Sequence, residues 1–136
     1  MNFSTAEALT IGRSLCCDVS GDLMYFLLNA AQQTERGGSL YLEFQPGPYQ
    51  NRHWQTDSLY LPAPLFDDLG LYDLFVRAIP QFDYYYYTEV RPDQFRLLLE
   101  LAEEHHTQCA AEILAELAPH AEKWLDEYGC FTICGI

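Results

Sequence analysis

Residues 82–90 have the sequence FDYYYYTEV and lie between Pro80 and Pro92. Successive side chains of a β-strand point to opposite faces, so as a strand this segment would present two different surfaces. We expect the first surface to belong to the core, and it comprises Phe82, Tyr84, Tyr86, Thr88 and Val90. The second surface places two tyrosines between two carboxylates, and it comprises Asp83, Tyr85, Tyr87 and Glu89.

The second surface predicts a protein-binding site. A solvated sheet face does not need large aromatic side chains, whereas tyrosine combines a rigid apolar body with a polar tip and is enriched where proteins bind one another. Three more carboxylates lie shortly before it in the chain, and we expect them to form its rim: Asp67, Asp68 and Asp73.

The composition indicates one folded domain that spans residues 1–136. Apolar residues make up 49% of the chain and aromatic residues 15%, which is enough for a single core. Twenty acidic residues against seven basic ones give a formal charge of -13. This balance argues against nucleic acid, which needs a basic surface to displace counterions. It favours a basic partner, although acidity can also serve only to keep a protein in solution.

The chain shows no targeting or membrane signal. No apolar stretch approaches the roughly 18 residues needed to span a bilayer, and no basic segment followed by an apolar one begins the chain. We therefore expect a cytoplasmic protein without membrane contact. The five cysteines are an odd number and include the adjacent pair Cys16 and Cys17, so we expect small buried side chains rather than a disulfide framework.

Alternating and helical patterns together predict an α+β fold, with about five helices packed on a sheet of about four strands. The expected strands are residues 39–45, 58–62, 83–90 and 130–135, of which the first two could pair and the last, apolar on both faces, should be interior. Strand 39–45 alternates and is expected to be half-buried.

Caps and prolines indicate where the helices begin and end. Residues 5–17 fit a helix that begins after a capping box at Ser4, and we favour this helix, although the segment also fits a strand. A second helix is expected from about residue 21 to about residue 35. Pro64 suits the first turn of a helix that continues to Ile79 with a possible break at Gly70. Later helices should begin near Pro92 and after a possible turn at Thr107, with a kink or a new first turn at Pro119 and an end at Gly129.

The segment 46–56 is rich in turn-forming residues yet carries Tyr49, His53 and Trp54. Aromatic side chains on a loop either fold back on the core or face a partner. We favour folding back, because large aromatic side chains are seldom left wholly exposed.

No motif for catalysis or for a cofactor is present. The histidines and cysteines near residues 105–134 lack the paired spacing of a zinc site, so we expect no metal. No Gly-x-Ser-x-Gly, P-loop or dinucleotide-binding pattern occurs either. The sequence thus predicts no cofactor and a protein that is not an enzyme, although a small enzyme with a site assembled in three dimensions is a third alternative.

In size, charge balance and lack of catalytic motifs, the chain resembles the small acidic immunity proteins that bacteria encode beside polymorphic or contact-dependent toxins. Its last residues, 124–136 (WLDEYGCFTICGI), add to the resemblance as a helix that leads into a terminal strand. The resemblance implies tight binding of a cognate toxin, often a basic nuclease, through the acidic, tyrosine-rich surface. The alternative function is a scaffold or regulatory module that forms homo-oligomers or binds a housekeeping partner.

Overall fold

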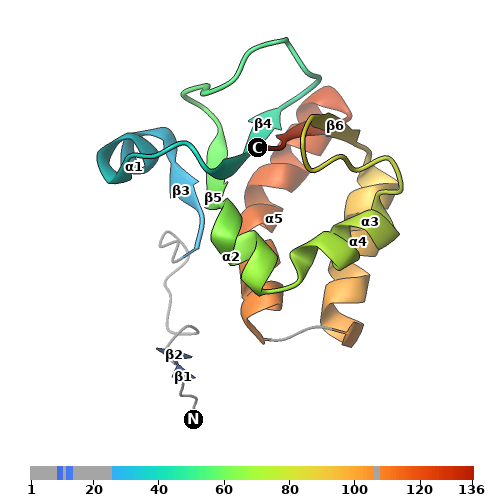
Figure 1. Cartoon of the computed structure of the whole chain (residues 1–136). Helices are drawn as coiled ribbons and strands as arrows, with labels where there is room; N and C mark the ends of the chain where they lie inside the picture. Colours follow the sequence, from blue (N-terminus) through green and yellow to red (C-terminus); the bar gives the residue numbers. More distant parts are fainter. Residues whose placement is uncertain (1–8, 11, 14–25, 106–107) are drawn as a thin grey trace.

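The computed structural model describes residues 9–10, 12–13, 26–105 and 108–136 (Figure 1). It confirms the α+β prediction for one domain: five helices accompany a five-stranded antiparallel sheet. A separate two-stranded ribbon lies near the amino terminus, formed by β1 (Leu9–Thr10) and β2 (Gly12–Arg13).

The five-stranded sheet has the order β3-β5-β4-β7-β6. Its strands are β3 (Leu28–Asn29), β5 (Leu59–Pro62), β4 (Tyr41–Pro46), β7 (Phe131–Cys134) and β6 (Tyr87–Val90). The predicted pairing of β4 with β5 is confirmed, with Leu42 opposite Leu61. The prediction that the last strand is interior is also confirmed, because β7 lies between β4 and β6.

The helices are α1 (Ala30–Arg36), α2 (Ala63–Asp68), α3 (Leu71–Ala78), α4 (Pro92–His105) and α5 (Gln108–Tyr128). Pro64 lies in the first turn of α2, and Gly70, with φ of 68°, separates α2 from α3 as predicted. Left-handed backbone is strained for residues with a Cβ, which is why a glycine suits this break. Helix α5 continues through Pro119 without a new first turn.

One face of the sheet packs against helices α2 to α5 and forms the core. Alternate residues of β4, β5, β6 and β7 point to this side, among them Leu42, Phe44, Leu59, Leu61, Val90, Phe131 and Ile133, all at most 4% exposed. The facing helices contribute Phe66, Leu74, Phe75, Phe95, Leu98, Leu114 and Leu117. This apolar burial is the main stabilising contribution to the fold.

The other face of β4 is covered as well, so the prediction that strand 39–45 is half-buried was wrong. Glu43 is only 4% exposed and Gln45 is fully buried, because the loop between β4 and β5 packs over them. This loop contains residues 47–56 of the aromatic-rich segment. Tyr49 and Trp54 fold back, on Tyr87 and Tyr60, as expected, whereas His53 stays exposed. The Trp54 ring stacks on Tyr60 at 5.7 Å while remaining 49% exposed.

The tyrosine-rich segment differs from its prediction. Only Tyr87–Val90 forms the strand β6, whereas residues 83–86 form a turn. The side-chain Oδ1 of Asp83 accepts a hydrogen bond from the Tyr85 amide at 2.9 Å, and such local bonds compete with a sheet ladder. The alternation of side chains between two faces therefore begins only at Tyr87. Tyr86, which was expected in the core, is 63% exposed.

The expected helix over residues 21–35 begins later, at Ala30. Residues 21–25 lie outside the described part of the chain, and the prediction was wrong for residues 26–29. Glu116 accepts hydrogen bonds from the amides of Phe26 and Leu27, which holds this segment extended before β3. Asn29 then caps α1 in a capping box with Gln32.

Of the segment 5–17, the structure describes only the four residues of β1 and β2. They pair as strands, so the helix that we favoured for this segment was wrong at these four positions. The capping box predicted at Ser4 lies outside the described residues.

Candidate partner-binding surface

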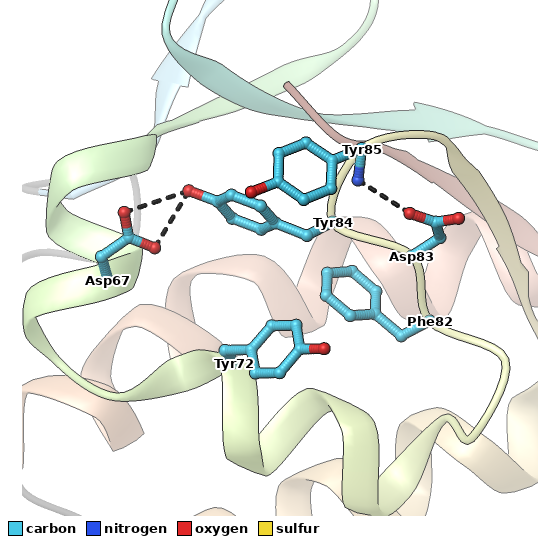
Figure 2. Close-up of a pocket in the computed structure, with 6 residues that line it drawn as sticks. All are labelled: Asp67, Tyr72, Phe82, Asp83, Tyr84 and Tyr85. Carbon is cyan, nitrogen blue, oxygen red and sulfur yellow. Dashed lines mark hydrogen bonds between the residues drawn. The ribbon is translucent and has the colours of Figure 1, made fainter.

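A pocket of about 510 Å³ lies where α2, α3 and the turn before β6 meet (Figure 2). Four aromatic side chains and two carboxylates line it: Asp67, Tyr72, Phe82, Asp83, Tyr84 and Tyr85. We call it the acidic aromatic pocket. Its composition is suited to a group that is both flat and positively charged, because such a group can contact ring faces and carboxylates together.

Tyr84 connects the turn to α2. Its hydroxyl donates to both carboxylate oxygens of Asp67, at 2.9 and 3.1 Å (Figure 2), and its ring stacks on the buried ring of Phe66 at 5.7 Å. Burial, and then the hydrogen bond and negative charge of Asp67, raise the pKa of Tyr84 to about 12. The phenol therefore keeps its proton at physiological pH, and Asp67 stays oriented along the pocket wall.

Asp83 fixes the opposite side of the turn. Its amide donates to the Thr88 hydroxyl at 3.0 Å, and its carboxylate accepts from the Tyr85 amide. Tyr85 is 75% exposed and its ring meets the Tyr84 ring edge-on at 5.1 Å. Together with exposed Tyr86, it forms an aromatic surface beside the pocket that is held by a structured turn.

The carboxyl-terminal residues hold this turn in place. Gly135 donates to the Tyr86 carbonyl at 2.7 Å, and Ile136 donates to the Tyr84 carbonyl at 2.9 Å. A Cβ on Gly135 would lie only 1.9 Å from the Tyr84 carbonyl oxygen. Glycine is therefore required here by close approach of two backbone segments.

No base among the residues that the structure describes neutralises the carboxylates of the pocket. Neither Asp67 nor Asp83 has a salt bridge to any residue that the structure describes; Arg91 pairs instead with Asp93, at 3.4 Å. Both aspartates are exposed. Their charge is thus available to a cation from outside.

The structure brings only some of the predicted site residues together. Asp67, Asp83 and Tyr85 line the pocket as a group, whereas Asp68 and Asp73 are exposed but do not line it. Tyr87 is half-buried and stacks on Tyr49 at 3.9 Å, and Glu89 accepts a hydrogen bond from the Tyr49 amide. These two residues therefore help to hold the loop between β4 and β5.

Sequence reasoning missed Tyr72, Phe82 and Tyr84 as pocket residues. Strand alternation assigned Phe82 and Tyr84 to the core, which suits their partial burial but not their position beside Asp67 and Asp83. Tyr72 was detectable, since an aromatic side chain next to Asp73 in the first turn of a helix is unusual on a solvated face.

A second, smaller pocket of about 300 Å³ lies under the loop between β4 and β5, and we call it the loop pocket. Its walls include Glu43, His53, Trp54, Tyr85, Tyr86 and Cys134. Glu43 and Cys134 are opposite each other in the pairing of β4 with β7. Burial, and then the nearby charge of Glu43, raise the pKa of the Cys134 thiol to about 12.

Comparisons of this chain with protein-family models, curated proteins and solved structures find no match. Among the residues that the structure describes, no helix is both long and apolar enough to cross a bilayer. We therefore argue a function from the acidic aromatic pocket and the surface around it.

Proposed function

We propose that this chain is a non-enzymatic inhibitor of the immunity type, which binds a basic toxin domain through the acidic aromatic pocket and the adjoining surface of Tyr85 and Tyr86. The observation that carries the proposal is the pocket itself, in which four aromatic rings lie together with two carboxylates that have no basic partner within the described chain. The resemblance in size and charge to immunity proteins indicates the class of partner.

An arginine side chain of the partner is the ligand that fits the pocket best. Its guanidinium group is planar, always charged and weakly hydrated, so it can stack on tyrosine and bind carboxylates at once. Asp67 and Asp83 can accept charge-assisted hydrogen bonds, which are stronger than neutral ones. Basic side chains of this kind are what a nuclease uses to hold a phosphate backbone.

Exposed aromatic side chains around the pocket support a protein partner rather than a small cation alone. Tyr85 and Tyr86 are 75% and 63% exposed, and Tyr72 is nearly half exposed. Tyrosine and tryptophan are typical hot-spot residues at interfaces, where they bury large areas with little loss of conformational freedom. The net charge of -13 would also accelerate encounter with a basic partner.

The test begins with the gene neighbourhood and ends with a binding titration. Where the adjacent reading frame encodes a large secreted protein, its variable carboxyl-terminal domain is purified and titrated with this chain by calorimetry. We expect one-to-one binding, and we expect Tyr85→Ala to weaken it by more than about 2 kcal/mol, or about thirtyfold in Kd.

Leu97→Ala is the matched control, because Leu97 is an exposed apolar residue of α4 that lines neither pocket. It should bind the toxin domain like the wild type. No binding of the neighbouring domain by the wild type would refute the proposed function. Equal binding by wild type and Tyr85→Ala would refute the proposed surface.

A further inference from the structure

Three side chains with metal-binding atoms meet in the loop pocket. One ligand atom each from Glu43, His53 and Cys134 lies within 4.8 Å of the other two. They come from β4, from the loop between β4 and β5, and from β7. Spacing rules for zinc motifs cannot detect them, because the histidine is ten residues from the glutamate and the cysteine is far along the chain.

Glu43 has unusual surroundings for a carboxylate. It is 4% exposed, and no salt bridge joins it to a base within the described residues. Its oxygens accept hydrogen bonds from the Trp54 amide, the Gln55 amide and the Ser58 hydroxyl, at 2.8, 2.9 and 2.7 Å. These hydrogen bonds hold the side chain in one position and partly stabilise its charge, but no cation lies opposite it among the described residues.

One coordination position on Glu43 remains. Oε2 accepts from Gln55 and Ser58, whereas Oε1 accepts from Trp54 and from no other residue in the described part of the chain. The Tyr60 hydroxyl donates to the Gln55 carbonyl at 2.6 Å and makes a longer bond to Oε2 at 3.4 Å, so it does not occupy Oε1. A carboxylate has about four lone-pair sites, so Oε1 retains one for a cation.

His53 and Cys134 complete the set. The His53 ring is exposed and is oriented by the Tyr49 hydroxyl, 3.2 Å from Nε2, which is the kind of outer contact that metal-binding histidines have. Cys134 is 1% exposed and lies across from Glu43 in the sheet. Ligand atoms around zinc are about 3.5 Å apart, and the exposed imidazole can move the short distance needed.

From this arrangement we infer that Glu43, His53 and Cys134 bind one zinc ion. Zinc is bound in proteins by cysteine sulfur, imidazole nitrogen and carboxylate oxygen, and its open sites have three protein ligands. With Cys134 as thiolate, two negative ligands balance the charge of Zn²⁺, so the buried carboxylate is compensated. The fourth position opens into the loop pocket, whose wall includes Tyr85 and Tyr86, and water occupies it in the isolated protein.

Cobalt is the probe for this site, because a cysteine thiolate bound to Co²⁺ gives a charge-transfer band in the near ultraviolet and four-coordinate cobalt absorbs strongly in the visible. The full chain is reduced, freed of metal with a chelator and titrated with Co²⁺. We expect both bands to saturate at one equivalent and to disappear when Zn²⁺ is added. Absence of the bands would overturn the inference.

Variants identify the ligands. Cys134→Ser should remove the charge-transfer band, while Cys130→Ser and the double variant Cys16→Ser/Cys17→Ser should keep it. His53 is exposed, so His53→Ala should fold normally, and we expect it to weaken binding by at least about tenfold. Wild-type affinity in His53→Ala, or a band that persists in Cys134→Ser, would refute the site.

Discussion

Replacing Gly135 by alanine tests how the aromatic surface is held. An alanine Cβ at this position would lie 1.9 Å from the carbonyl oxygen and 2.4 Å from the carbonyl carbon of Tyr84. Cβ atoms in proteins essentially never approach closer than 3.0 Å, so the two backbone segments must separate by about 1 Å. Unlike a flexible side chain, these backbone atoms cannot simply rotate away.

The separation strains both hydrogen bonds between the carboxyl terminus and the turn, which join Gly135 to Tyr86 and Ile136 to Tyr84. Each such bond contributes roughly 0.5–1.5 kcal/mol. We therefore expect Gly135→Ala to lower the free energy of unfolding by about 1–3 kcal/mol, while the slope of this free energy against urea concentration stays unchanged. The turn that carries Tyr85 should also loosen.

Urea denaturation followed by circular dichroism measures the first effect, and hydrogen exchange at the amides of residues 135 and 136 measures the second. Ile136→Ala is the matched control, because it shortens an exposed side chain and keeps both backbone bonds. Wild-type stability and wild-type protection of the two amides in Gly135→Ala would show that the close approach of Gly135 to Tyr84 does not hold the turn.

Two further predictions concern Tyr84 and Glu43. The pKa of Tyr84 is raised from 10.0 to about 12, so the folded state holds this proton more tightly than the unfolded state. The protonated Tyr84 hydroxyl therefore contributes fully to stability below pH 10, and this contribution is lost as the pH rises to about 12. Urea denaturation should therefore show that the wild type loses more stability than Tyr84→Phe over this range, and equal losses would contradict the assignment. Glu43→Gln should lower the free energy of unfolding by about 2–3 kcal/mol in the presence of a chelator. The NH2 group of the glutamine must then face the Trp54 or the Gln55 backbone N–H, from which a carboxylate oxygen accepted a hydrogen bond. An unchanged urea midpoint would show that Glu43 does not hold the loop.

Much of the fold follows from side-chain periodicity. Leu42 and Phe44 in β4, and Phe131 and Ile133 in β7, point to the core as their alternation predicts. Gly70 and Gly129, both with positive φ, end helices as expected. These signals work because each depends on neighbouring residues alone.

Predictions failed where distant parts of the chain decide the local structure. Glu116 is 90 residues from Phe26 in sequence, yet its carboxylate binds the Phe26 amide and prevents a helix there. The loop between β4 and β5 buries Glu43, which an isolated alternating strand would expose. No local pattern contains this information.

The tyrosine segment was partly predictable. Tyr85 and Asp83 were expected on one exposed face and are both exposed, but the turn created by Asp83 also places Tyr84 and Phe82 in the pocket. Asp83 was the signal in the sequence, because an aspartate side chain often accepts a hydrogen bond from the amide two residues later and so favours a turn over a strand. The contact of Tyr84 with Asp67 depends on tertiary packing and had no signal in the sequence.

The most direct test is the affinity for the double variant Asp67→Asn/Asp83→Asn of the domain that we propose as the partner, the variable carboxyl-terminal domain encoded by the adjacent reading frame. Asparagine retains an oxygen to accept from the Tyr84 hydroxyl and from the Tyr85 amide, so the substitutions remove charge and preserve shape. We predict that the Kd rises at least tenfold and that its dependence on salt becomes shallower than for the wild type. An unchanged Kd and an unchanged salt dependence would contradict the claim that this pocket binds a cationic side chain.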